Sequence, residues 1–502
     1  MTSLRFLLNK YVELVYQNAI AGQALAILII KCSRLISRIP YGLYCFRIGE
    51  ISKSLQTLKK VNLNVNNVYI YIARSEEILK KLNDSSKIHL SKESNYEKSE
   101  FNHSIIFACH SNGYFHPNGY AYRTKEIAAA LSNSQIEIHA MTRLGYPWDI
   151  PEYMQVEKVN STKFRDLEFK HFEDKERSIA GPDSIYIQRY ADIIVAEVQK
   201  SNSTIIHAHS NYINGHAAAQ AGNRLGIPSV FEMRGLWHLS RAVKEPIFEG
   251  TEHYQYLEKM EIEAAMLCDH VVTLNQSLKS WLISKGVDES KISVVPNSVH
   301  LRNEDTLQNK TKDVYTFGFA GSITAYEGLD DLVEAIRLLK NKGVPIQLRV
   351  AGSGSYFSTL KKLVTDYKLE KQIKLLGRIP NSAIEEFYKT VDAIVIPRKD
   401  YEVTRLVTPL KLVEAMNYGK PVVCSDLSAL KEVVSDGVDG ILFQSGSAED
   451  LVLKLQDLIN RPDKGLSLAR AAHEKIANDF NWEKSAMGYL KIYNGFYNSD
   501  SN

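Results

Sequence analysis

Short runs of β-branched and aromatic residues alternate with segments of helical period along most of this 502-residue chain, and no other feature limits its fold so strongly. In the first half, Tyr120–Leu131, Asn214–Leu225 and Gln276–Lys285 carry the helical period. Strands that alternate with helices indicate a parallel sheet with helices on both faces. The strands predicted in this half are Ser104–Cys109, Ile136–Met141, Thr204–His209, Ser229–Met233, His270–Leu274 and Ile292–Val295.

The alternation breaks at Pro296–Asn297, and after a polar stretch to Asp313 it starts again. Helices over Leu329–Lys342 and Lys411–Tyr418 connect the strands of this second half. The sequence therefore predicts two tandem Rossmann-like, doubly wound α/β domains that face an interdomain cleft, where ligands commonly bind. The strands predicted in the second half are Thr316–Ala320, Ile346–Ala351, Ile373–Leu376, Ala393–Ile396, Pro421–Cys424 and Gly440–Phe443.

Four segments follow from this pattern, and the chain is long enough for two substantial cores at about 150 residues per domain. Residues 1–100 are expected to form a helical extension that ends in a polar linker. The first Rossmann-like domain is placed at residues 101–305 and the second at residues 306–480. The last segment, 481–502, contains a helical stretch whose sequence permits it to pack back on the first domain.

The N-terminal extension contains an apolar run, Ala19–Ile30, with basic residues on both sides. Twelve residues give only about 18 Å of helix, whereas a bilayer span needs about 20 residues. No small-residue cleavage site follows the run, so a signal peptide is not indicated. Two interpretations stay open: residues 1–50 make a peripheral contact with an anionic membrane surface, or the run packs on the protein itself.

Charge and cysteine content narrow the class of protein. The 61 Lys and Arg residues nearly balance the 58 Asp and Glu residues, whereas nucleic-acid binders usually carry a basic excess. The five cysteines are scattered and form no CxxC pair, which is typical of reduced cysteines in a core. We therefore expect a cytoplasmic protein, peripheral on the inner face of the membrane at most, with no nucleic acid and no zinc among its ligands.

The first predicted strand is followed by a loop with glycine and proline that ends at Gly119. Such residues let the backbone approach a ligand, and the helix that follows offers free N–H groups to an anion. Tyr120 and Arg123 lie in its first turns and are candidate residues for the acceptor side of a cleft. An ordinary strand-to-helix loop is the alternative.

Two later strands of the first half also end in chemically capable residues. Strand alternation sends His207 and His209 to the same face, where either can stabilise a departing diphosphate or hold a hydroxyl. A hydrogen-bonded structural histidine is the alternative. Arg234 follows the next strand and suits phosphate or carboxylate recognition, although an ion pair with Glu232 or Glu245 explains it equally well.

In the second half, the first strand ends at Gly321 and Ser322, in a loop that could present amides to a diphosphate. The next strand ends in a similar glycine-rich turn, Ala351–Gly354. Neither loop carries the GxxxxGK[ST] pattern of a P-loop, which disfavours an ATPase.

The most informative segment runs from Arg398 to Glu414. Thr408 and Pro409 are expected to start a helix whose first turn exposes amides to an anion. Lys411 and Glu414 lie three apart on one helix face, as a cation for phosphates and a carboxylate for ribose hydroxyls. A surface ion pair between these two residues is the alternative.

Taken together, these segments resemble glycosyltransferase family 4, whose members are retaining enzymes of the GT-B fold that use nucleotide sugars without a metal. The resemblance runs from about residue 104 to 497, and the branch that it is most similar to is found in bacterial exopolysaccharide, capsule and lipopolysaccharide assembly. The segments that carry it are GYAYRTKEIAAAL (Gly119–Leu131), TRLGYPWD (Thr142–Asp149), HAHSNYINGHAAAQAG (His207–Gly222), EMRGLW (Glu232–Trp237), VVPNSV, GFAGSITAYEGLDDL, PLKLVEAMNYGKPVVCSD and EVVSDGVDGILF.

The resemblance implies roles for individual residues. Glu414 matches the family glutamate that holds the ribose, and Thr408 to Leu410 match the loop whose amides face the donor. His209 matches the histidine near the donor sugar and phosphate. Gly119 matches the glycine-rich loop that shapes the donor and acceptor cleft.

The sequence departs from the family pattern at the diphosphate. The family's Arg and Lys, five residues apart, are replaced by Ser322 and Glu327, and the glutamate expected eight residues before Glu414 is replaced by Leu406. We interpret this as a variant site, in which other cations hold the diphosphate. The candidates are Arg398, Lys411, Arg378 and Arg234.

We therefore predict an enzyme that transfers a sugar from a nucleotide donor to a glycan or lipid-linked acceptor, with retention, without a metal and without a bound cofactor. Cations and helix amides would stabilise the leaving diphosphate and an oxocarbenium-like sugar. Two alternatives remain: a nucleotide-sugar epimerase with the same fold, and a catalytically weak glycan-assembly protein. A dehydrogenase is disfavoured because neither half has a G-x-G-x-x-G after its first strand.

Overall fold

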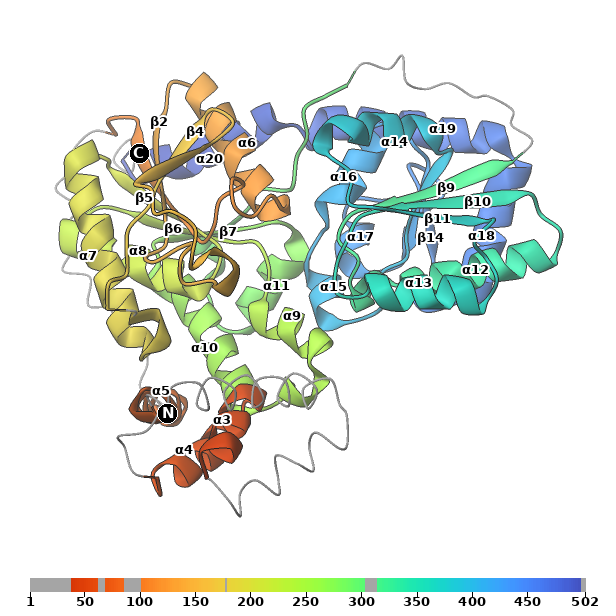
Figure 1. Ribbon diagram of the computed structural model, residues 1–502. Helices are drawn as coiled ribbons and strands as arrows, with labels where there is room; N and C mark the ends of the chain where they lie inside the picture. Colours follow the sequence, from red (N-terminus) through yellow and green to blue (C-terminus); the bar gives the residue numbers. More distant parts are fainter. Residues whose placement is uncertain (1–37, 62–67, 85–100, 177, 303–313, 498–502) are drawn as a thin grey trace. The chain divides into compact units, whose positions relative to one another are not determined.

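The computed structural model describes residues 38–61, 68–84, 101–176, 178–302 and 314–497 of the 502-residue chain (Figure 1). Contacts between residues divide it into two compact units. Unit 1 comprises Met1–Val272, Lys285–Lys291 and Tyr493–Asn502, and unit 2 comprises Thr273–Ser284 and Ile292–Ile492, each to the extent that the structure describes them. The chain therefore returns to unit 1 at Tyr493, near the end of its last helix.

Unit 1 is built on an eight-stranded sheet of order β3-β4-β2-β1-β5-β6-β7-β8, of which β8 and the last residue of β7 fall within the residue ranges of unit 2. The pairs around its centre are parallel, as the alternation of strands and helices predicts. A β3–β4 hairpin at one edge is antiparallel, and the sequence analysis missed it because its exposed residues form no apolar run. The strands are β1 (Ser104–Cys109), β2 (Glu137–Thr142), β3 (Ser161–Phe164), β4 (Leu167–Lys170), β5 (Ile205–His209), β6 (Ser229–Met233), β7 (His270–Thr273) and β8 (Ile292–Val294).

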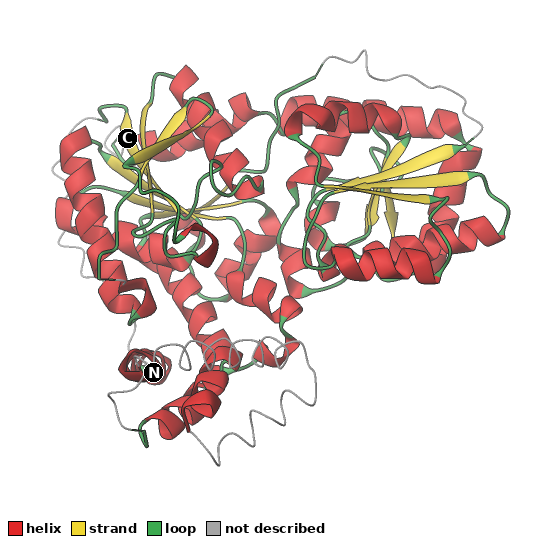
Figure 2. Ribbon diagram, in the orientation of Figure 1, coloured by secondary structure: helices red, strands yellow, loops and turns green. Residues whose placement is uncertain are grey.

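Helices pack against this sheet and follow its strands (Figure 2). All six residues of β1 are buried, as are all five of β5, so the central strands lie between helical layers. The helices of unit 1 are α3 (Arg38–Ile48), α4 (Ile51–Leu58), α5 (Val68–Asn83), α6 (Gly119–Asn133), α7 (Asp183–Ser201), α8 (Tyr212–Leu225), α9 (Trp237–Lys244) and α10 (Glu252–Leu267).

The N-terminal helices α3 to α5 are attached to the body of unit 1. The Glu77 carboxylate accepts hydrogen bonds from the first amides of α7, Asp183 N at 2.6 Å and Ser184 N at 2.8 Å. Lys81 pairs with the buried Glu263 of α10 at 2.6 Å. The apolar run at residues 19–30 lies outside the described residues. Within them, every helix is too short or too polar to cross a bilayer.

Unit 2 is built on a six-stranded sheet of order β11-β10-β9-β12-β13-β14, in which every pair is parallel. The predicted strands of the second half all form, with ends that move by one residue at most. The strands are β9 (Tyr315–Ala320), β10 (Ile346–Ala351), β11 (Ile373–Gly377), β12 (Ala393–Ile396), β13 (Val422–Ser425) and β14 (Ile441–Phe443). The helices are α11 (Gln276–Ser284), α12 (Leu329–Asn341), α13 (Phe357–Asp366), α14 (Ile384–Thr390), α15 (Glu402–Leu406), α16 (Leu410–Asn417), α17 (Ser428–Lys431), α18 (Ala448–Asn460), α19 (Pro462–Asp479) and α20 (Trp482–Gly495).

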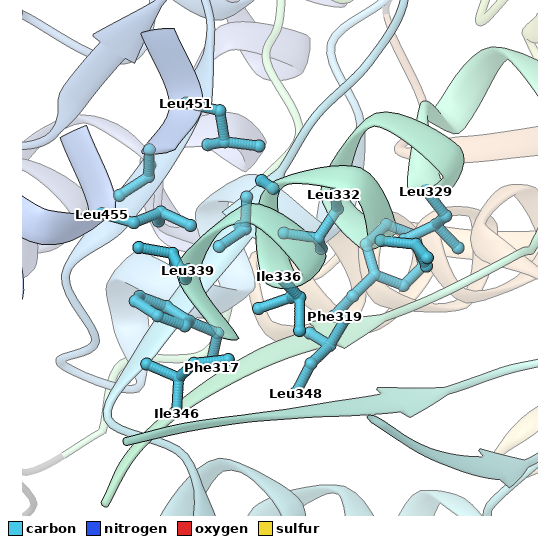
Figure 3. Packing of buried hydrophobic residues seen from close by; sticks show 14 of the residues in the cluster. Phe317, Phe319, Leu329, Leu332, Ile336, Leu339, Ile346, Leu348, Leu451 and Leu455 are labelled. Carbon is cyan, nitrogen blue, oxygen red and sulfur yellow. The ribbon is translucent and has the colours of Figure 1, made fainter. Parts of the chain in front are cut away.

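A close-packed apolar cluster joins α12 to the sheet of unit 2 (Figure 3). Leu332, Ile336 and Leu339 recur at helical spacing on the buried face of α12 and meet Phe317 and Phe319 of β9. This packing holds the carboxyl end of β9, where the candidate donor loop begins.

Each sheet has one point at which the strand order reverses. In unit 1 the chain passes from β1 to β2 on one side of β1 and later places β5 on the opposite side of β1. In unit 2 it passes from β9 to β10 on one side of β9 and later places β12 on the opposite side of β9. The loops diverge at such a point and leave a crevice at the carboxyl ends of the strands, where open α/β sheets bind ligands. Most of the candidate residues follow these strands, whereas Arg234 follows β6 and Arg378 follows β11.

Candidate active site

In unit 1, the carboxyl ends of β5 and β6 hold a buried group of charged side chains. Glu232 is fully buried, and its Oε1 accepts hydrogen bonds from Arg123 Nε at 2.8 Å and from Arg234 Nε at 2.5 Å. Burial by itself raises the pKa of Glu232, but the two guanidinium groups outweigh it and hold that pKa well below its usual range. Glu232 is therefore a carboxylate that joins α6 to β6.

The same group corrects the roles expected for the two arginines. Arg123 is 2% exposed and Arg234 3% exposed, so neither presents an open cationic face to a ligand. Arg234 also donates to the Tyr120 carbonyl at 2.8 Å, to Thr124 Oγ1 at 2.6 Å and to His209. Of the two uses considered for Arg234, the ion pair with Glu232 is the one that the structure shows.

The two histidines of β5 lie on one face, as strand alternation predicts, with ring centroids 4.3 Å apart. His207 lies 3.3 Å from Glu232 and bonds the Tyr493 hydroxyl at 2.8 Å, so it has the structural role considered as its alternative. His209 Nδ1 faces Arg234, which can only donate, so its proton is placed on Nε2. Burial, reinforced by Arg234, holds the pKa of His209 well below 6.5. His209 is therefore neutral at pH 7.

A cavity of about 140 Å³ opens beside this group, at the reversal point of the unit 1 sheet. Tyr120 and Trp237 lie on its wall and are 38% and 37% exposed. Gly119 begins α6 just above it, and a methyl group there would meet nothing within 4 Å. Packing within the chain therefore does not require this glycine. The lining residues are Cys109, His110, Ser111, Asn118, Tyr120, Thr124, His209, Ser210, Arg234 and Trp237.

In unit 2, the reversal point holds a second buried group with the same composition, one carboxylate and two cations. Glu327 is 3% exposed, and its two oxygens lie 3.3 Å from Arg398 Nη2 and 2.8 Å from Lys411 Nζ. Burial raises the pKa of Glu327, but Arg398 and Lys411 outweigh it and lower that pKa overall. Burial lowers the pKa of Lys411, and Glu327 opposes that shift. Glu327, which departs from the family pattern, thus gathers two of the four proposed replacement cations.

The sequence analysis considered that the glycine loops of unit 2 could present amides to a diphosphate, but two of these amides bond to carbonyls within unit 2. Gly321 N donates to Ala351 O at 2.9 Å, and Gly352 N donates to Gly377 O at 2.7 Å. Ser322, next to Gly321, is exposed. A Cβ on Gly321 would lie 2.9 Å from Lys411 Cε, so this glycine makes room for the lysine.

Gly321→Ala is expected to displace Lys411 from Glu327 and to lower the thermal midpoint of unit 2. Gly321 has a φ of +149°, so its alanine variant carries backbone strain as well, on the order of 1–3 kcal/mol. Gly446→Ala is the matched control, because Gly446 has a φ of +79° and open space around its Cβ position. Acylation of Lys411, measured by mass spectrometry, should rise in Gly321→Ala alone. Equal acylation in both variants would contradict this placement of Lys411.

The start of helix α16 differs from the predicted capping. Pro409 occupies the N-cap position, and no side chain caps the helix. Thr408 is buried, and its hydroxyl donates to Ala429 O at 3.1 Å and accepts a hydrogen bond from Asn275 at 2.8 Å. Thr408 therefore fixes the loop before the helix, while Leu410 begins the helix itself.

Glu414 and Lys411 do not form the surface ion pair considered as an alternative, because Lys411 pairs with Glu327. Glu414 is partly buried, and this burial raises its pKa, with Lys411 opposing. Within the described residues, the Glu414 carboxylate makes no hydrogen bond. Arg378 follows β11, two strands away from the reversal point, and is exposed. The structure thus brings Arg398 and Lys411 together and leaves Arg378 apart from them.

The sequence analysis missed Glu232 and Glu327 as the centres of the two charged groups. Glu232 was weighed only as a partner for Arg234, and Glu327 only as a departure from a pattern. Glu232 lies in the carboxyl half of β6 and Glu327 follows β9, and these positions near the carboxyl ends of parallel strands were the available signal. Within the described residues, no three His, Cys, Asp or Glu side chains gather where they could hold a metal ion.

Comparison with known proteins identifies the class that this fold and these sites define. Residues 117–303 match the family described as Glycosyltransferase Family 4, and residues 302–475 match Glycosyl transferases group 1. Together the two matches cover more than two thirds of the chain, and the chain belongs to glycosyltransferase family 4.

Individual relatives agree with this assignment. The uncharacterised glycosyltransferase MJ1178 of Methanocaldococcus jannaschii is 26% identical over 59% of this chain and 76% of its own. The amylovoran biosynthesis glycosyltransferase AmsK of Erwinia amylovora is 28% identical over 40% of this chain, a match that spans half of AmsK. The crystal structure of Anabaena Alr3699/HepE in complex with UDP superposes with a TM-score of 0.60 and 16% identity, over 78% of this chain and all of that one. The fold is GT-B.

Proposed function

We propose that this glycosyltransferase takes a sugar from a nucleoside diphosphate sugar bound at the reversal point of unit 2 and transfers it, with retention, to a glycan or lipid-linked acceptor. The observation that carries the proposal is the buried Glu327–Arg398–Lys411 group. It sets two cations where loops diverge at the carboxyl ends of β9 and β12. The structure of Anabaena Alr3699/HepE in complex with UDP supports a nucleotide ligand for this fold.

The chemistry follows from these side chains. Departure of a diphosphate leaves negative charge, which fixed cations in a buried site stabilise more strongly than water does. Arg398 and Lys411 are held in place before the donor arrives, because Glu327 contacts both. Lys411 lies in the first turn of α16, and the free amides of that turn add the partial positive charge of a helix N-terminus. Glu414, one turn further along the same helix face, is placed to accept ribose hydroxyls.

The finer features remain part of the proposal. Retention and independence from metal rest on the family resemblance. A role in surface polysaccharide synthesis is supported by the name of the AmsK relative. We place the reaction on the cytoplasmic side of a membrane, with residues 1–50 as a peripheral contact.

Binding and turnover across UDP-, GDP-, ADP- and CMP-sugars test the proposal. One donor should bind saturably and be hydrolysed slowly, and product NMR should show the donor's anomeric configuration. Glu414→Ala should weaken donor binding by roughly 10- to 100-fold, since a hydrogen bond to a charged group contributes about 1.5–3 kcal/mol. Lys411→Ala should lower the turnover number by roughly 100-fold or more.

Glu449→Ala and Lys362→Ala are matched controls, because both residues are exposed on other helices of unit 2. Neither should change donor affinity by more than about twofold. Conversion of a donor to its epimer without an acceptor would identify an epimerase instead. Absence of binding to every donor would leave the glycan-assembly protein as the better description.

A further inference from the structure

The cavity of unit 1 offers a ligand polar atoms without free positive charge. Among the described residues, Arg234 is the only Lys or Arg on the wall of this cavity. Four of its five N–H groups already have acceptors: the Glu232 carboxylate, the Tyr120 carbonyl, Thr124 Oγ1 and His209 Nδ1. An entering phosphate would therefore find one guanidinium N–H and no open ion-pairing face.

Two other cations near the cavity also pair with carboxylates. Arg143, which lies near enough to His110 to lower the pKa of that imidazole, holds Asp149 with two hydrogen bonds of 2.7 and 3.2 Å. Arg123 is buried against Glu232. A phosphate in this place would have to compete with these carboxylates for N–H groups that already have acceptors. Unit 2 differs in this respect, because Lys411 Nζ carries three N–H groups and has a single ion-pair partner, Glu327, within the described residues.

The remaining wall is neutral and capable of hydrogen bonding. It carries the hydroxyls of Ser111 and Ser210, the Asn118 amide and two imidazoles. His209 is 2% exposed, and its Nε2, which carries the proton, has no hydrogen-bond partner within the described residues. His110 Nδ1 lacks a partner in the same way. Buried polar atoms are rarely left unpaired, so these two nitrogens indicate ligand oxygens or water.

Two aromatic rings complete the wall. Tyr120 and Trp237 both expose more than a third of their surface. Trp237 is held at its backbone, where its amide donates to Glu261 Oε1 at 2.7 Å, and its ring meets His110 edge to face at 4.6 Å. A rigid aromatic face beside neutral hydrogen-bonding groups suits a ring with apolar C–H faces and hydroxyl edges.

We infer that this cavity binds an uncharged pyranose of the acceptor, and not a phosphate or another anionic group. The inference rests on the proposed transferase function and narrows its acceptor to one whose reacting end is a neutral sugar. It replaces the expectation that Arg234 recognises an anion.

The full-length protein, without nucleotide, can be titrated with methyl glycosides of glucose, galactose, mannose and N-acetylglucosamine, and separately with inorganic phosphate and glucose 1-phosphate. Saturation-transfer NMR should detect binding of at least one methyl glycoside. Its affinity should stay the same between 50 and 500 mM salt, because no ion pair forms. Neither phosphate compound should compete with it.

Trp237→Ala and Tyr120→Ala should each lower the affinity for the methyl glycoside by roughly 2- to 10-fold, as expected for loss of an aromatic contact. Tyr114→Ala is the matched control, since Tyr114 is 60% exposed in the loop between β1 and α6 and is not on the cavity wall. Unfolding midpoints that match wild type would show that each variant folds.

Competition by phosphate, or affinity that falls steeply with salt, would overturn the inference while leaving the transferase proposal intact if donors still bind unit 2. Equal effects of Tyr114→Ala and Trp237→Ala would also overturn it. Failure of the wild-type protein to bind any nucleotide-sugar donor would instead contradict the proposed function itself.

Discussion

Glu327→Gln should destabilise unit 2 by about 3–5 kcal/mol, because it leaves two buried cations without their shared carboxylate. The side chains of Glu327, Arg398 and Lys411 are 4%, 7% and 11% exposed, so water cannot replace the lost charge. Amide hydrogen exchange in β9 and β12 should therefore become faster in the variant. A nucleoside diphosphate such as UDP should restore protection more strongly in the variant than in wild type, because it supplies negative charge.

Glu334→Gln is the matched control for this experiment. Glu334 contacts Arg337 at 2.7 and 2.5 Å, but both side chains are about one-third exposed on α12. A surface pair of this kind contributes roughly 0–1 kcal/mol. Equal exchange rates in the two variants would show that the Glu327 group does not stabilise unit 2. Stabilisation of both variants by UDP to the same degree would remove the link to a phosphate site.

Unit 1 should lose stability as pH falls below about 6.5, because its fold keeps several histidines neutral. Burial is the largest cause of the lowered pKa in every case, and the pKa falls to about 4 for His171 and His216 and to about 3 for His253. The described histidines with a lowered pKa all lie in unit 1. They are His110, His116, His171, His207, His209, His216 and His253.

The sign follows from proton uptake. Between the unfolded pKa near 6.5 and the lower folded value, the unfolded chain binds a proton that the folded chain does not. Each such histidine therefore costs up to about 1.4 kcal/mol of stability per pH unit over that range. For His216 the range is from about 6.5 to about 4.

Amide hydrogen exchange at pH 7.5, 6.5, 5.5 and 5.0 would test whether unit 1 loses stability as the pH falls. Peptides from β5 and β6 should lose protection, after correction for intrinsic exchange rates, before peptides from β9 and β12 do. His216→Gln keeps a donor for the Met260 carbonyl, which His216 Nε2 contacts at 3.0 Å, and should make the pH dependence shallower. Simultaneous loss of protection in both units would contradict the assignment of acid sensitivity to unit 1.

Much of the fold could be predicted because its strands are buried on both faces. Strands β1 and β12 are buried at every residue and appear in the sequence as uninterrupted apolar runs. The β3–β4 hairpin turns at Arg165, which has a φ of +56° although it is not glycine, so the usual turn signal is missing there. Propensity alone could not indicate this edge of the sheet.

The candidate sites were predictable in position but not in pairing. Strand alternation placed His207 and His209 on one face, because that relation is local. The contact between Lys411 and Glu327 joins residues 84 positions apart, and no local pattern encodes it. For the same reason the sequence could not distinguish an Arg234 that binds a ligand from one that holds Glu232. The role of Arg234 depends on its buried ion pair with Glu232, which is visible only in the folded structure.

The return of the chain to unit 1 at Tyr493 affects the order in which the two units can complete their folding during synthesis. Tyr493 is fully buried and bonds His207, and Tyr497 donates to the Thr204 carbonyl at 2.7 Å. The ribosome releases these residues only after all of unit 2 has emerged. Unit 1, although most of it is synthesised first, therefore completes its contacts at His207 and Thr204 only after unit 2 has been synthesised, and a change near Tyr493 would affect the unit whose other residues lie more than 200 positions earlier in the chain.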